Sequence, residues 1–92
     1  MIDVKKAVNT AKEYIQDFFA PETLSGLELE EVELSEDAKT WLVTLGFTSK
    51  KEQNVSELLA SRQAMREYKL FRIDAETGQI LSMKTRTYDR YS

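Results

Sequence analysis

Two stretches of alternating apolar and polar residues flank a short turn near the end of the chain, and this pattern constrains the fold most. Residues 66–73 and 80–86 show the two-residue period of strands. Between them, Asp74 can accept backbone N–H groups at the start of a turn, and Gly78 can adopt the positive φ that closes it. The sequence therefore predicts a β-hairpin with strands at residues 64–74 and 79–90.

An isolated hairpin is marginally stable in water, so its apolar side needs further strands and a covering helix. We expect that side to consist of Phe71, Ile73, Leu81 and Met83. The covering helix is predicted at residues 3–19, with Asp3 as its N-cap, and it cannot continue into Pro21. Its core-facing stripe comprises Val4, Ala7, Val8, Ala11, Tyr14, Ile15, Phe18 and Phe19.

Two further strands are predicted between the helix and the hairpin, at residues 27–35 and 40–49. In the first, the apolar phase slips between Leu29 and Val32, which indicates a β-bulge near Glu30 and Glu31.

The second of these strands places Trp41, Val43, Leu45 and Phe47 on one side, with the Trp41 ring at the contact between sheet and helix. Gly46, in mid-strand, indicates a bulge or a close backbone approach. Ninety-two residues suit a single domain. The predicted fold is α+β, with one N-terminal helix packed on a curved four-stranded antiparallel sheet.

The amino-acid composition excludes most of the common catalytic mechanisms. The chain has no Cys and no His, which excludes disulfides, thiolate nucleophiles, the commonest general base and the usual zinc ligands. The carboxylates of residues 28, 30, 31 and 33 are interpreted as solvent-facing, because an oxygen-ligand cation site needs about six converging ligands. We therefore expect no catalytic residues, no cofactor and no metal.

The two halves of the chain carry opposite net charge. Residues 1–46 hold ten acids and four bases, giving −6, and residues 47–92 hold six acids and nine bases, giving +3. We expect the two halves to neutralise each other in the fold. A pI of about 5.0 argues against nucleic-acid binding, and the lack of an export signal or a long apolar run predicts a cytoplasmic protein without a membrane contact.

Residues 49–63 are the first candidate for a contact surface with a protein partner, since long loops in small domains are often functional. Residues 55–60 fit either one or two helical turns or a protruding arm. Leu58 and Leu59 either close this loop inward or offer an apolar docking patch. Together with the hairpin turn, the predicted contact residues are Lys51, Gln53, Val55, Leu58, Leu59, Glu76 and Thr77.

The hairpin also resembles a known family. Residues 68–81, Tyr-Lys-Leu-Phe-Arg-Ile-Asp-Ala-Glu-Thr-Gly-Gln-Ile-Leu, are similar to the PepSY domain family, whose strands are joined by an Asp-Ala-x-Thr-Gly-x-Ile/Val turn. The similarity continues more weakly into the helix, and residues 21–63 match in predicted topology. This family, with its wider cystatin-like shape, includes propeptide and regulatory domains that restrain peptidases. The resemblance implies a non-catalytic binding or inhibitory module.

The leading hypothesis is thus a small binding or regulatory module, with a peptidase-inhibitor-like role. The alternative is a small-ligand-binding or enzymatic cone with a pocket between helix and sheet, in which Glu67 or Asp89 acts as base and Tyr14 or Tyr68 as donor. The charges of the last strand, at residues 84, 86 and 90, disfavour edge-to-edge pairing and favour a monomer over a homodimer.

Overall fold

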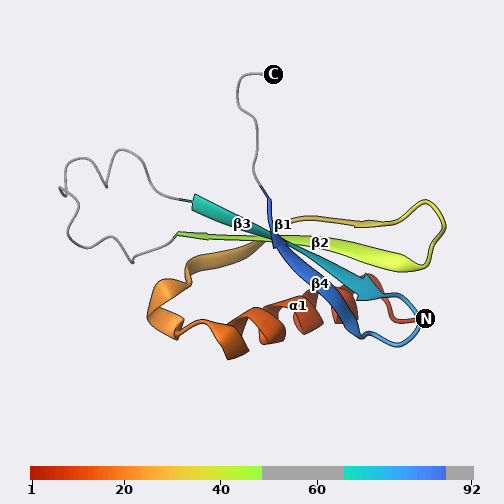
Figure 1. Cartoon of the computed structure of the whole chain (residues 1–92), viewed down its shortest axis with the longest axis horizontal. Coiled ribbons are helices and arrows are strands. Elements are labelled where there is room, and N and C mark those ends of the chain that lie inside the picture. The colour runs from red at the N-terminus through yellow and green to blue at the C-terminus, as the bar shows by residue number, and fades with distance from the viewer. Residues whose placement is uncertain (49–65, 87–92) are drawn as a thin grey trace, which may run out of the picture.

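The computed structural model describes residues 1–48 and 66–86. In these residues a single layer of helix lies on one sheet (Figure 1). The elements are α1 (Val4–Phe18), a 3₁₀ turn η1 (Pro21–Thr23), β1 (Ser25–Leu34), β2 (Thr40–Thr48), β3 (Arg66–Asp74) and β4 (Ile80–Thr85). The strands form a sheet of order β1-β2-β3-β4 in which all neighbours are antiparallel. The predicted α+β fold, one N-terminal helix on a four-stranded antiparallel meander, is confirmed.

The helix begins as predicted. The Asp3 carboxylate accepts a hydrogen bond from the backbone N–H of Lys6 at 2.8 Å, which makes Asp3 the N-cap. Ala7, Ala11 and Ile15 are fully buried against the sheet. Because alanine is small, the helix backbone can lie close to the strands at these positions.

The predicted apolar stripe is wrong at two residues, Val4 and Phe18, which are 43% and 64% exposed. At the first turn, Ile2 packs against the core in place of Val4. At the last turn, the chain leaves the helix at Phe19, whose ring lies 6.1 Å from that of Phe47. Ile2, just before the helix, therefore takes the core position that the periodicity assigns to Val4, while Phe19 packs against the core as predicted.

The first strand contains the predicted bulge. The β1–β2 register shifts between Leu29 and Glu31, which leaves Glu30 as the inserted residue. As a result Leu27 and Val32, on either side of the bulge, both pack against the core. A second shift, between Ser25 and Glu28, has no counterpart in the prediction.

The prediction for Leu81 is wrong, because β4 also contains a register shift. Ile73 pairs with Ile80 and Arg72 with Ser82, which leaves Leu81 unpaired and 49% exposed. Ile80 packs against the core instead, beside Met83. Among the described residues β4 ends at Thr85, and residues 87–90 of the predicted strand lie outside them.

The core lies between α1 and the facing side of the sheet. Its largest buried side chains there are those of Phe71, Ile15, Leu45, Ile73 and Val43. Trp41 packs against this core as predicted, and its indole N–H donates to the carbonyl of Ile2 at 3.2 Å. In the described part of the chain, no helix combines the length and the apolar character needed to cross a membrane.

Candidate functional site

The hairpin tip, residues 74–79, is held in one conformation by its own side chains. The Asp74 carboxylate accepts backbone N–H groups from Glu76 at 2.8 Å and from Thr77 at 2.9 Å. Gly78, at φ +80°, donates its N–H to the carbonyl of Asp74 at 2.8 Å. Both roles predicted for Asp74 and Gly78 are confirmed.

The tip is also fixed to two other segments of the chain. Ala75 is fully buried; its N–H donates to the carbonyl of Lys39 at 2.9 Å, and its carbonyl accepts from the N–H of Ile2 at 2.8 Å. The N-terminus and the β1–β2 turn therefore meet the hairpin tip at one end of the sheet (Figure 1). This makes the tip a rigid part of the domain.

The hydrogen bonds at both turns stabilise ionised carboxylates. The backbone N–H groups of Thr77 and Glu76 lower the pKa of Asp74 below its ordinary value. In the β1–β2 turn, the Ser35 hydroxyl and the N–H of Lys39 lower the pKa of Asp37 in the same way.

Two of the predicted contact residues lie on this tip, and both are exposed. The Glu76 side chain is 77% exposed, with its Oε1 atom 3.8 Å from the N-terminal ammonium. The Thr77 hydroxyl accepts the N–H of Gln79 at 3.2 Å. The other five predicted contacts, Lys51, Gln53, Val55, Leu58 and Leu59, lie outside the described residues.

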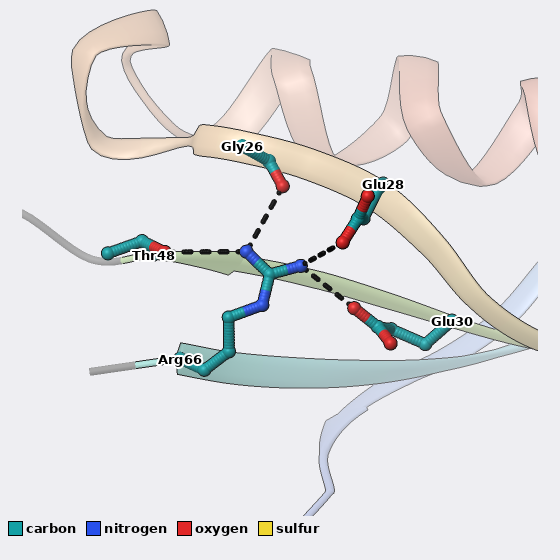
Figure 2. A network of polar contacts seen from close by, with 5 residues as sticks. All are labelled: Gly26, Glu28, Glu30, Thr48 and Arg66. Atoms are coloured by element: carbon teal, nitrogen blue, oxygen red, sulfur yellow. Dashed lines mark hydrogen bonds and ion pairs between the residues drawn. The ribbon is translucent and has the colours of Figure 1, made fainter. Parts of the chain in front are cut away.

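A polar network crosses the side of the sheet opposite α1, which we call the helix-free face (Figure 2). Arg66 of β3 reaches over β2 to β1, where its Nη2 atom lies 3.0 Å from Glu28 and 2.8 Å from Glu30. Its Nη1 atom donates to the carbonyl of Gly26 at 3.2 Å and to the Thr48 hydroxyl at 3.3 Å. The Glu30 contact is the main reason why the pKa of Arg66 is raised above its ordinary value.

Gly46 provides the space that this network needs. A Cβ atom at Gly46 would lie 2.5 Å from the Oε2 atom of Glu30. The register of β2 with β3 runs without a shift through Gly46, and the shifts on the other side insert residues in β1. The contact at Gly46 is therefore made by a side chain, and not by the bulge or the close backbone approach that the sequence predicts.

A second network lies further along the same face. The Nη1 atom of Arg86 lies 2.7 Å from Glu31 and donates to the Thr44 hydroxyl at 2.9 Å. Thr44 is only 1% exposed, although no described element covers this face. The expected neutralisation between the two halves of the chain is realised in these pairs. In the described residues, no three acidic side chains converge as a metal site would require.

A cleft lies at the other end of the helix. It has a volume of about 320 Å³ and is lined by Gln16, Phe19, Pro21, Leu24 and Leu27. None of these lining residues is ionisable, so the cleft offers apolar surface and the polar amide of Gln16 but no acid or base.

Sequence reasoning missed the arginines as organisers of the helix-free face. Their glutamate partners lie 36 to 55 residues away in the chain, so only the strand register reveals them. The signal that could have found Arg66 is Gly46, whose missing side chain marks a place where another residue crosses the strand.

These features define a small α+β domain of one helix on an antiparallel meander, with a rigid hairpin tip. No family model matches the chain, and neither a curated protein nor a solved structure matches it. The fold agrees with the architecture that the PepSY-like resemblance implies, and the agreement concerns the fold alone.

Proposed function

We propose that the chain is a small non-catalytic binding or regulatory module that contacts a protein partner through its hairpin tip. The observation that carries this proposal is the combination of an exposed tip and a fixed backbone at residues 74–79. The partner class that the PepSY-like resemblance implies is a peptidase, and the role an inhibitory one.

A fixed tip suits recognition for a thermodynamic reason. Ordering a flexible segment costs about 1–2 kcal/mol per residue in backbone entropy, and a partner would have to supply that free energy on binding. At this tip the backbone is already held by Asp74, by Lys39 and by Ile2. The exposed side chains of Glu76 and Thr77 can therefore be presented without a large ordering cost.

The absence of Cys and His from the whole sequence supports the non-catalytic part of the proposal, because a thiolate nucleophile and the commonest general base are missing. The cytoplasmic location expected from the sequence stays a prediction.

The test combines capture with inhibition. Immobilised chain is incubated with an extract of its native cell, in parallel with Glu76→Arg and with Glu13→Arg, which makes the same charge change on the exposed surface of α1. We expect a protein that binds the wild type and Glu13→Arg and is lost from Glu76→Arg. A bound protein that Glu76→Arg retains at full level would contradict a contact through the tip.

The peptidase part is tested separately. The purified chain is added to serine, cysteine and metallo-peptidases, and to any peptidase captured from the extract. Inhibition that weakens in Glu76→Arg supports the inhibitory role. A captured partner without peptidase activity would reject that role and leave the binding module in place.

The cleft favours a second candidate, a carrier of a small apolar ligand. Its volume of about 320 Å³ lies at the lower end of the range for ligand sites. The enzymatic version of this alternative gains nothing from the cleft, since neither Glu67 nor Tyr14 lines it. Titration with an apolar fluorescent dye tests the carrier: Leu27→Trp, which fills the cleft, should abolish binding, and Leu81→Trp, at an exposed site, should not.

A further inference from the structure

The charges on the helix-free face are separated by sign. The strand register places four acidic residues on β1 and four basic residues on β3 and at β4, with the uncharged strand β2 between them. The acids are Glu28, Glu30, Glu31 and Glu33, and the bases are Arg66, Arg72, Lys84 and Arg86. These eight charges sum to zero, and they give the face a negative side and a positive side. Asp74, at the end of β3, also has the register of this face, but its carboxylate accepts the N–H groups of its own turn.

Ion pairs within the chain use only part of this charge. Arg66 contacts two glutamates, and Arg86 contacts Glu31. No described residue forms an ion pair with Glu33, Arg72 or Lys84, and all three are exposed. After these pairs, the β1 side keeps an excess of two negative charges and the β3–β4 side an excess of two positive charges.

We infer that a second copy of this chain docks on the helix-free face, with the two sheets stacked face to face. A twofold axis parallel to the strands, between β2 and β3, places β1 of each copy over β4 of the other. The negative side of each copy then meets the positive side of its partner. An axis across the strands would instead place β1 over β1, with acid facing acid, so the charge pattern selects the first arrangement.

The uncharged centre of the face fits the same arrangement, because the axis also places β2 of each copy over β3 of the other. Within one copy, Thr44 pairs with Leu70 and Gly46 with Tyr68. Stacking therefore brings each small β2 residue opposite a large β3 residue. Arg66 and Arg86 reach across β2 to glutamates of β1 in their own chain, so their side chains lie along the face; Figure 2 shows this for Arg66.

The size of the face predicts a weak dimer. Four strands of about eight residues, about 4.8 Å apart, cover roughly 500 Å² on each copy. Stable interfaces bury about 800 Å² per partner, and smaller ones are typical of transient complexes. The dimer should therefore dissociate on dilution, with a dissociation constant on the order of micromolar or weaker.

Sedimentation equilibrium of the full chain tests this inference, from about 5 µM to about 1 mM protein and at low and high salt. We expect a monomer–dimer equilibrium that shifts toward monomer as salt screens the charges. Glu33→Lys and Lys84→Glu should each weaken the dimer by roughly tenfold or more, because each brings like charges together in both halves of the interface. Glu13→Lys and Lys5→Glu, on exposed positions of α1, are the matched controls and should dimerise as the wild type does.

Mixing the two variants gives the sharpest result. In a heterodimer of Glu33→Lys with Lys84→Glu, one half of the interface places the two substituted side chains two residues apart along the facing strands, and their charges are opposite. The other half keeps the native side chains, with Glu33 level with Ser82 and Lys84 level with Glu31 of the facing copy. The mixture should therefore dimerise more strongly than either variant alone.

Circular dichroism confirms that each variant is folded. A monomer at every concentration, a dimer that resists both charge reversals, or a mixture no stronger than its components would each overturn the inference.

Discussion

The two faces of the sheet bury the same strand by different means. On the side of α1, Val43, Leu45 and Phe47 of β2 are buried by apolar side chains from the helix and from β3. On the helix-free face, Thr44 of the same strand is buried beneath charged side chains from β1 and the end of β4. A β2 side chain with a low exposed fraction is therefore covered by apolar side chains on the helix side, and by ion-paired side chains on the helix-free face.

This difference matters for stability, because the two kinds of contact contribute unequally. Burial of apolar area stabilises by roughly 25 cal/mol per Å², whereas an ion pair near the surface contributes about 0–1 kcal/mol. We therefore assign most of the folding free energy to the helix-covered face. The networks on the other face mainly fix the positions of β1, its bulge and the ends of the strands.

The largest expected effect is on the helix-covered face. Phe71 is fully buried, and its ring lies 6.0 Å from that of Tyr14. Phe71→Ala removes this side chain and leaves a cavity, so it should lower the free energy of unfolding by about 3–5 kcal/mol in urea titrations. The control is Phe18→Ala: because Phe18 is 64% exposed, the same substitution should cost only about 0.5 kcal/mol. Equal losses at the two sites would refute the assignment of the core.

The second prediction concerns the helix-free face. The Cβ of Gly46→Ala would displace the Glu30 carboxylate from Arg66, and we expect a loss of about 1 kcal/mol. In the background of Glu30→Ala nothing is left to displace, so the same substitution should cost close to nothing. A double-mutant cycle from thermal or urea unfolding measures this coupling. Additive losses would show that the glycine serves the backbone and not the network.

Local chemistry explains which parts of this structure the sequence can predict. The N-cap at Asp3 and the turn at residues 74–79 depend on neighbours within a few residues, and both predictions are confirmed. The bulge at Glu30 is predictable because the alternation of apolar and polar residues in this strand slips by one position there. The assignment of Val4, Phe18 and Leu81 to the core is wrong. The exposure of these side chains depends on how the helix and β4 sit against the rest of the chain, which the local pattern does not determine.

In the candidate site, too, some features follow from local sequence and others depend on contacts between distant segments. The exposure of Glu76 and Thr77 at a rigid tip follows from local turn chemistry. The anchoring of that tip by Ile2 and Lys39 does not, since it requires three segments to meet. The arginine networks also depend on strand register and could not be read from any single segment.

A third prediction provides a stabilised background in which both faces can be compared. Ala38, in the β1–β2 turn, has φ +61°, a left-handed conformation that disfavours a side chain with Cβ. Since Ala38 is exposed, Ala38→Gly loses no buried surface and should raise the free energy of unfolding by about 0.5–1 kcal/mol. Ala20→Gly, at φ −62°, is the control and should lower it. The gain should add to the loss at Phe71, which keeps that variant measurable.

The smallest expected effect is a change in how stability depends on pH, which should differ between a polar substitution and an apolar one. Hydrogen bonds from Thr77 and Glu76 hold the pKa of Asp74 below 3.8, the ordinary value that the unfolded chain would have. The carboxylate therefore contributes stability that is fully present above that value and is lost as the pH falls through the lower pKa of the folded state. Urea midpoints measured between pH 7 and about pH 2.5 should fall less steeply for Asp74→Asn than for the wild type. Phe71→Leu, by contrast, removes apolar contacts only and should lower the midpoint by the same amount at every pH. If Asp74→Asn kept the full pH dependence, the turn carboxylate would have no part in acid unfolding, and the difference between the polar and apolar parts would need another origin.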